Sequence, residues 1–216
     1  MSLSLIQFAL FYGSPIESIT KTVMSLQNIL GDAFDAEATI LPASPDIPPE
    51  IPIAILQSKD ESKSLNISRV RMDIFFKADN PLEEYSLDEA CHLFDTISQV
   101  LPMKDLSRFG VTLTYFSVTP NPVARVWQEY LQGNAEAECD ELLIRYNQPF
   151  FINENRYNFI RMIQNAVAEN ESGKHGGIAY SYDINTDPAR MSIRQEDIDT
   201  IIDKIKQINN SEHNKW

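Results

Sequence analysis

Apolar and polar side chains alternate along residues 3–12, a pattern that predicts a β-strand with one buried face. Beyond this strand the apolar residues recur every three or four positions, which is the spacing of an amphipathic helix. Ser14 and Glu17 are expected to form a capping pair at the helix start, with Pro15 in its first turn. Gly31 follows the last apolar position and is expected to end the helix. The chain therefore opens as strand, turn and helix.

The next segment is rich in proline and lies among short strands. Five prolines fall within residues 42–52. Because proline fixes φ and has no N–H donor, this stretch is expected to be a stiff, extended surface connector. Strands are predicted at residues 39–41, 53–58, 64–68 and 70–78. Ser86 and Glu89 then form a second capping pair, ahead of a helical apolar stripe that runs from Leu87 to Val100.

The second part of the chain repeats this order of elements. Residues 108–118 are rich in β-branched and aromatic side chains, which predicts a strand. Asn121 and Pro122 predict the start of a third helix, which Gly133 is expected to end. Three more strands are predicted, at about 139–152, 156–168 and 177–185, and the first two flank a hairpin turn at "NEN".

The last segment is predicted to be a helix with a polar tail. Ser192 and Gln195 form a third capping pair, and apolar residues keep helical spacing as far as Ile208. Residues 210–216 lose that spacing and are expected to form a mobile tail. Two interpretations of Trp216 stay open: an incidental exposed residue, or an anchor that docks on a partner.

The order of elements predicts the architecture. It reads β-α-β-β-β-β-α over residues 1–106 and β-α-β-β-β-α over residues 107–209. We expect an α+β protein that forms one compact unit, in which two β-α-β-meander-α halves form an antiparallel sheet with helices packed on one face. This order is similar to the topology of the TATA-binding protein, an analogy of topology that carries no function.

Four short stretches also resemble a known family. They are "PPEIP", "VRMDIFF", "RFGVTLTYF" and "YDIN", spread over most of the chain. Together they look like a sporadically distributed family of uncharacterised bacterial proteins. The resemblance implies mobile or conflict-related genes, and it brings no activity to carry over.

Composition and charge exclude several classes of function. Hydrophobic residues make up 43% of the chain, as in ordinary globular proteins. Acidic side chains number 31 against 18 basic ones, for a formal net charge of −13, so direct nucleic-acid binding is not expected. No apolar run approaches the ~20 residues that span a bilayer, and the first residues lack a basic export segment. A cytoplasmic protein without membrane contact is expected.

The sequence contains no pattern typical of catalysis or of metal binding. Cys91 and Cys139 are isolated thiols, and His92, His175 and His213 lie far apart, so neither a metal site nor a cofactor is expected. No Gly-x-Ser-x-Gly elbow occurs. We predict no catalytic residue and no enzyme activity, with the alternative that folding assembles an active site from scattered residues.

The stretch "NESGKHGG", residues 170–177, holds three of the seven glycines. A Walker-type phosphate loop needs Gly-Lys, then Ser or Thr, and then a helix. Here Gly173 and Lys174 are followed by His175 and by a predicted strand. We therefore predict a hairpin tip whose glycines supply positive φ. The alternative is a tip that grips a ligand or a partner through these three residues.

Charged residues also alternate along one predicted strand. Arg69, Arg71 and Asp73 share one face of it, opposite an apolar face. One interpretation is ordinary charge pairing on a solvated face. The other is a binding surface, formed by Arg69 and Arg71, for an anionic ligand or an acidic partner.

The leading hypothesis is a non-enzymatic protein-interaction module. The resemblance places it as an accessory, immunity or inhibitor subunit of a bacterial or phage conflict system. The expected partner is another protein, and the acidic charge favours a basic one. An oligomer of this chain is a further interpretation that stays open. One alternative is a sensor of an anionic small molecule or nucleotide, with walls drawn from Tyr146, Phe150, Phe151, Tyr157 and Phe159. Another is an acidic nucleic-acid mimic that blocks a nucleic-acid enzyme.

Overall fold

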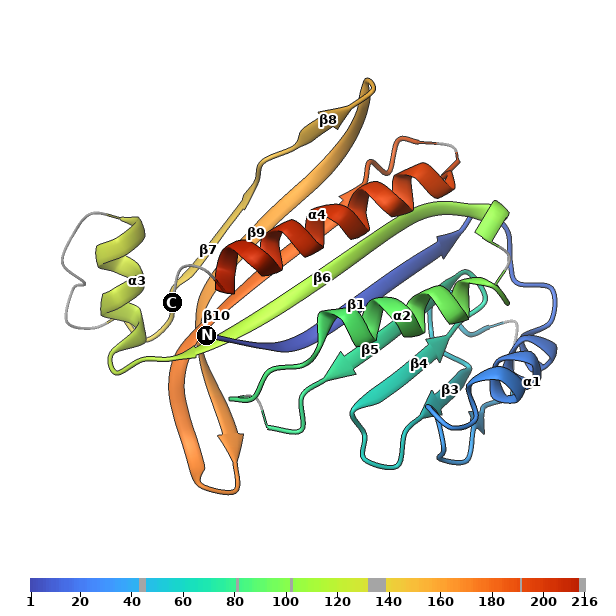
Figure 1. The fold of residues 1–216 in the computed structure, drawn as a ribbon, viewed down its shortest axis with the longest axis horizontal. Coiled ribbons are helices and arrows are strands. Elements are labelled where there is room, and N and C mark those ends of the chain that lie inside the picture. Colours follow the sequence, from blue (N-terminus) through green and yellow to red (C-terminus); the bar gives the residue numbers. More distant parts are fainter. Residues whose placement is uncertain (43–45, 81, 102, 132–138, 191, 214–216) are drawn as a thin grey trace.

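The fold is known from a computed structural model that describes residues 1–42, 46–80, 82–101, 103–131, 139–190 and 192–213. Within them, ten strands form one open antiparallel sheet accompanied by four α-helices (Figure 1). The expected α+β class with an antiparallel sheet is confirmed. The strands are β1 (Ser2–Tyr12), β2 (Thr39–Ile40), β3 (Ala54–Gln57), β4 (Lys63–Ile67), β5 (Arg71–Lys77), β6 (Leu106–Val118), β7 (Leu143–Asn147), β8 (Phe150–Ile152), β9 (Asn155–Asn170) and β10 (Gly173–Thr186). The helices are α1 (Ile19–Leu30), α2 (Leu87–Ser98), α3 (Pro122–Tyr130) and α4 (Gln195–His213), with a 3₁₀ turn at Met103–Asp105.

The sheet is built outward from a central pair of strands, β1 and β6. Its order is β2-β3-β4-β5-β1-β6-β10-β9-β7, and β8 pairs with β9. On one side β1 is bordered by β5, the last strand before α2. On the other side β6 is bordered by β10, the last strand before α4. Residues far apart in sequence therefore meet at the centre of the sheet, for example Phe8 with Val111.

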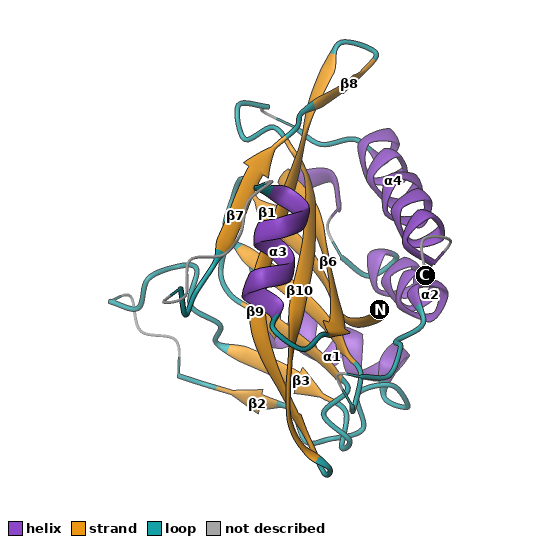
Figure 2. Ribbon diagram, turned by 90° about the vertical axis from the view of Figure 1, so that its left-hand side faces the viewer, coloured by secondary structure: helices purple, strands orange, loops and turns teal. Residues whose placement is uncertain are grey.

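The helices α2 and α4 lie together on one side of the sheet (Figure 2). Phe94 of α2 stacks on Phe8 of β1, with ring centroids 4.6 Å apart, and on Phe109 of β6, at 5.4 Å. Tyr115 of β6 donates a hydrogen bond of 2.7 Å to the side-chain oxygen of Asn209 on α4. The buried side chains of the central strands point to this side. We call the opposite side of the sheet the open face.

The first helix begins later than the sequence predicts. Ser18, not Ser14, caps α1, and its hydroxyl accepts from the N–H of Lys21 at 3.4 Å. The backbone ahead of α1 is engaged elsewhere, since Gly13 donates to the Asp105 carbonyl at 3.0 Å and the next turn also bonds outside the helix. These long-range bonds hold the predicted capping residues out of the helix.

The second and third helices begin where the sequence predicts. The Ser86 hydroxyl accepts from the N–H of Glu89 at 3.2 Å, so the predicted cap of α2 is confirmed. Pro122 is the first residue of α3, and Asn121 precedes it in the left-handed region with φ of 57°. Its side chain makes no capping bond there. Gly133 lies outside the described residues.

The fourth helix differs from the prediction at both ends. It begins at Gln195, and the carboxylate of Asp197 accepts from the N–H of Arg194 at 2.9 Å, so Asp197 and not Ser192 provides the cap. The helix also continues beyond Ile208 to His213 instead of losing its structure. Glu212 in the last turn is buried, so this polar turn packs against the rest of the protein and the helix extends through it.

The second meander follows the prediction with shifted boundaries. The strand expected at 139–152 is two strands, β7 and β8, because Pro149 interrupts it. The "NEN" turn is confirmed, with positive φ at Asn153 (48°) and Glu154 (66°), as a two-residue hairpin requires. Strand β10 begins at Gly173, four positions before the predicted start at Gly177.

Candidate binding site on the open face

The pairing register places three rows of side chains next to one another on the open face. Three residues of β1 are each paired with one residue of β6: Phe11 with Arg108, Ala9 with Gly110, and Gln7 with Thr112. Strand β5 extends two of these rows with Arg71 and Asp73. Strand β10 extends two with Asn185 and Asp183. The first row is cationic and aromatic, the middle row is small at its centre, and the third row is polar.

This difference in size creates a cavity of about 280 Å³ in the middle of the sheet. Ala9 and Gly110 present only a methyl group and a hydrogen, so the longer side chains of the other two rows stand above them. A Cβ at Gly110 would lie 2.8 Å from the Cβ of Asn185, so glycine is required where β6 and β10 approach. The cavity is lined by Gln7, Ala9, Phe11, Arg71, Arg108, Gly110, Thr112, Asp183 and Asn185, and each of these is half-buried or buried.

Arg71 is neutralised within the protein. Its Nη2 donates to Oδ1 of Asp73 at 2.7 Å. Its Nε lies 2.6 Å from Oδ2, an ion-pair contact that lacks the alignment of a hydrogen bond. Gln7 also donates to Asp73 at 2.8 Å. The predicted charge alternation on this strand is therefore real, but most of the Arg71 charge is compensated by Asp73.

Arg108 has no such partner. Its guanidinium carbon lies 5.2 Å from the centroid of the Phe11 ring, and Arg71 approaches the same ring at 4.7 Å. Among the described residues, none of the ion pairs includes Arg108, and its buried Nε makes no hydrogen bond. An unsatisfied buried donor costs about 1–3 kcal/mol. Arg108 is thus a cation that lines the cavity and can donate a hydrogen bond to an acceptor on another molecule.

The opposite end of the cavity is anionic. The Asn185 amide donates to Oδ1 of Asp183 at 2.8 Å, and Asn158 donates to Asn185 at 3.0 Å. Asn147 donates to Asn158 at 2.9 Å, which continues the chain of amides to β7. These bonds orient Asp183 without neutralising it, since the ion pairs found in the described ranges do not include it.

Of the two arginines predicted as a binding surface, only Arg71 reaches this cavity. Arg69 lies in the turn before β5, where its N–H donates to the Pro49 carbonyl at 3.0 Å. Its guanidinium donates to the Ile47 carbonyl. Arg69 therefore fastens the proline-rich connector to the sheet. Residues 46–52 contain neither helix nor strand, as the prolines predict.

The stretch "NESGKHGG" forms the tip of the β9–β10 hairpin, as predicted. Of its three glycines, only Gly173 has the predicted positive φ, at +116°, because Gly176 and Gly177 are paired within β10. Lys174 is exposed. The Nε2 of His175 lies 2.9 Å from the Ser172 hydroxyl and 3.1 Å from the Asn170 side-chain oxygen, so it closes the tip from within. Gly173 is about 33 Å along β10 from Asp183, so the tip and the cavity are separate. Trp216 lies outside the described residues.

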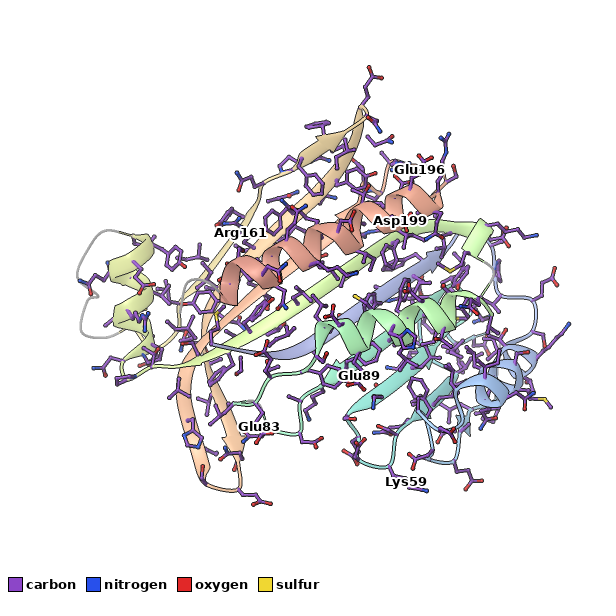
Figure 3. The ribbon with its side chains drawn as sticks, in the orientation of Figure 1. Lys59, Glu83, Glu89, Arg161, Glu196 and Asp199 are labelled. Carbon is purple, nitrogen blue, oxygen red and sulfur yellow. The ribbon has the colours of Figure 1, made fainter. Side chains whose placement is uncertain are left out.

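A second, smaller cavity of about 110 Å³ lies on the helix side, beside Arg161 of β9 (Figure 3). The Arg161 guanidinium lies 4.5 Å from the Phe159 ring centroid, and its buried Nε has no hydrogen bond within the described chain. Tyrosines and two glutamates complete the lining: Tyr130, Tyr146, Tyr180, Tyr182, Glu129 and Glu212. Burial first, and then the Glu212 carboxylate, raise the pKa of Tyr182. The aromatic walls predicted for a sensor are only partly gathered here, because Phe151 is exposed and Tyr157 is buried elsewhere.

Another cavity, of about 600 Å³, lies between the start of α2 and the second half of α4. Its charged lining residues, Glu84, Asp88 and Lys206, are all exposed, as on ordinary helix surfaces. The described residues contain no group of three or more His, Cys, Asp or Glu placed to hold a metal. None of the helices within the described ranges is long and apolar enough to cross a membrane.

Compared with known proteins, the chain matches no family model and no curated protein. The assignment of function therefore depends on the geometry of the open face. Arg108, Asp183 and the small pair Ala9 and Gly110 are residues that the sequence does not single out. Their alternation within each strand is visible in the sequence, but their association depends on the pairing of β1, β6 and β10.

Proposed function

We propose that this protein is a non-enzymatic protein-interaction module whose partner docks on the open face, over the cavity. The observation that carries the proposal is Arg108, a half-buried cation that lines the cavity and has no acceptor for its Nε in the described chain. Protein interfaces place such arginines in well-packed, desolvated centres. The cavity is smaller than the ~300–1,000 Å³ typical of small-molecule sites, which favours a protein side chain as its occupant.

The chemistry of the lining supports recognition over catalysis. A cation, a carboxylate, amides and a threonine hydroxyl line the cavity. The thiol of Cys91 is on α2 and the imidazole of His175 is at the hairpin tip, away from this lining. Within this proposal, the role as accessory, immunity or inhibitor subunit of a conflict system rests on the family resemblance described above.

The proposal includes a two-half architecture. Counted outward from the central pair, β5, β4 and β3 follow β1 in the same way that β10, β9 and β7 follow β6. In each half a helix follows the innermost strand in sequence, and a second helix closes the meander. This correspondence supports two β-α-β-meander-α units, with the TATA-binding protein as an analogy of topology. Each half would then contribute one side of the binding face.

The proposal is tested by filling the cavity. Ala9→Leu places a larger side chain in its floor, and Ser64→Leu makes a similar change on β4, on the same face but outside the cavity. Each tagged variant and the wild type are purified from the native host under gentle conditions, with circular dichroism as a check of folding. We expect a stoichiometric partner with the wild type and Ser64→Leu, and its loss with Ala9→Leu. A partner that Ala9→Leu retains, or a wild type recovered as a partnerless monomer, would overturn the proposal.

Arg161 in the smaller cavity favours a second candidate function, the sensing of an anion of only a few heavy atoms, because about 110 Å³ is too small for a nucleotide. Arg161 would supply the positive charge and the surrounding tyrosines the polar and aromatic walls. A thermal-shift screen with formate, acetate and small inorganic anions tests this candidate. Stabilisation that Arg161→Gln removes supports it, and a flat response throughout contradicts it.

A further inference from the structure

We infer that the cavity recognises a carboxylate of the protein partner, held by Arg108, together with a neighbouring N–H donor, held by Asp183. This inference depends on the proposed function for the identity of the partner as a protein. It specifies the chemical group that the partner brings. The two charged ends of one cavity are the observation on which it is built.

The cationic end suits a carboxylate. A guanidinium offers paired N–H donors whose geometry matches the two oxygens of a carboxylate. Arg71 already uses its donors on Asp73, whereas Arg108 has no carboxylate partner in the described chain. Contact with the Phe11 ring shields one side of Arg108 from water, and a charge pair formed there is less screened than on an open surface.

The anionic end selects against a second negative charge. Asp183 lines the cavity, and Asp73 borders it beside Ala9. A phosphate dianion on Arg108 would meet more repulsion from these two carboxylates than a singly charged carboxylate would. In contrast, an amide N–H close to Asp183 would gain a charge-assisted hydrogen bond. The site therefore favours a monoanion with a donor next to it.

The spacing of the rows fits a short stretch of extended protein chain. Arg108 and Thr112 are four positions apart on β6, and Thr112 is paired with Asp183. Four residues of strand span about 13 Å between Cα atoms. Both residues line the same cavity, and Asp183 accepts from Asn185 of the middle row, so the carboxylate and the N–H donor of the ligand must lie closer together than this. Two or three extended residues that end in, or carry, a carboxylate cover such a distance.

The experiment uses small probes and the signal of one side chain. The buried Nε–H of Arg108 is followed by ¹⁵N NMR in the full chain, and its signal is assigned by its loss in Arg108→Gln. Acetate, inorganic phosphate and N-acetylglycylglycine are titrated in turn, the last because it joins a carboxylate to amide donors. Arg156→Gln is the matched control, since Arg156 is paired with Asp187 and does not line the cavity.

We expect N-acetylglycylglycine to shift the Arg108 signal at the lowest concentration, with acetate weaker and phosphate weakest. Binding to the variants is followed by the backbone amide signal of Gly110, which lines the cavity and is present in all of them. Arg108→Gln should weaken binding of the acetylated dipeptide about tenfold or more, and Arg156→Gln should leave it unchanged. Asp183→Asn should lower the affinity for the dipeptide to nearly that for acetate. Phosphate as the strongest probe, or a dipeptide that binds equally well to Asp183→Asn, would overturn the carboxylate-and-donor assignment.

The result also separates this inference from the proposed function. A second outcome is that no probe shifts the Arg108 signal while Ala9→Leu still loses its partner. In that case the open face docks a partner, but Arg108 does not bind a carboxylate. If the probes bind but Ala9→Leu retains the partner, the result supports the anion site and refutes the docking proposal. Only the combination of Arg108 binding and cavity-dependent docking supports both.

Discussion

Replacement of Asp197 by asparagine should destabilise the protein strongly, because this carboxylate fastens the start of α4 to the sheet. Asp197 is 2% exposed and accepts a hydrogen bond of 2.5 Å from the Tyr157 hydroxyl of β9. Arg190 donates to both carboxylate oxygens, with Nη2 at 2.8 Å from Oδ2. The N–H of Arg194 donates to the same group at 2.9 Å. The Asp197→Asn substitution would keep the shape of the side chain but leave Arg190 without its counter-charge.

The size of the effect follows from this arrangement. Loss of one partner from a buried ion pair costs about 3–5 kcal/mol. The side chain of Arg190 is 18% exposed and can recover part of its hydration, so we expect the lower end, about 3 kcal/mol. With a urea dependence of about 2–3 kcal/mol per molar, the unfolding midpoint should fall by about 1 M. That is a large share of the roughly 5–15 kcal/mol that stabilises a typical domain.

The pH dependence supplies an independent check. Burial raises the pKa of Asp197, but hydrogen bonds from Arg190, Tyr157 and the Arg194 N–H outweigh burial and hold this pKa below its ordinary value. A lowered folded-state pKa gives stabilisation that is complete above the unfolded pKa, about 3.9, and is lost as pH falls through the folded value. The gap between wild type and Asp197→Asn should therefore be widest at neutral pH and shrink below about pH 4.

Urea unfolding of both proteins from about pH 3 to pH 7 measures the effect, with Asp199→Asn as control. Asp199 is exposed in the same part of α4 (Figure 3), so its replacement should change stability by less than about 0.5 kcal/mol. A loss below about 1 kcal/mol for Asp197→Asn at neutral pH, or a gap that does not narrow in acid, would refute the reasoning.

Two further predictions use neighbouring or paired residues as controls. A Cβ at Gly177 would lie 2.5 Å from both an aromatic carbon and a carbonyl oxygen, whereas one at Gly176 would meet nothing within 4 Å. Gly177→Ala should therefore cost about 1–3 kcal/mol in thermal unfolding and Gly176→Ala much less, and equal effects would contradict this packing. Burial raises the pKa of the Cys91 thiol to about 11, so at about pH 8 iodoacetamide should modify half-buried Cys139 well before Cys91. Mass spectrometry of the alkylated protein follows the order, and faster labelling of Cys91 would show that α2 opens.

The sequence predicts a helix or strand well where residues close together in the chain determine where it begins and ends. The stripe from Leu87 and the Ser86 cap lead to α2 because both depend on residues within one or two turns. The prediction is wrong at Ser14 and Ser192, because bonds to other segments hold the chain near them out of the helices, and Ser18 and Asp197 provide the local caps instead. At the start of α4, Ile193 donates to the Leu106 carbonyl at 3.2 Å, a bond between segments that no local pattern relates.

The candidate site is harder to predict for the same reason. Arg71 is visible in the sequence because it alternates with Asp73 in one strand. No local pattern singles out Arg108. Its place in the cavity depends on Phe11, Gly110 and Asp183, which lie on three different strands. A one-residue shift in the β1–β6 register would place Ala9 and Gly110 on opposite sides of the sheet and remove the cavity.

The central pairing of β1 with β6 has a consequence for synthesis of the protein. Strand β1 begins at Ser2, whereas β6 begins at Leu106, so about a hundred residues must be made between them. At about 5–20 residues per second, β1 emerges from the ribosome roughly 5–20 s before its partner. Strand β5 can cover one edge of β1 meanwhile, but the other edge keeps unpaired N–H and C=O groups next to fully apolar side chains. Until β6 has been made, the nascent chain therefore presents an unpaired strand edge that favours association with other chains.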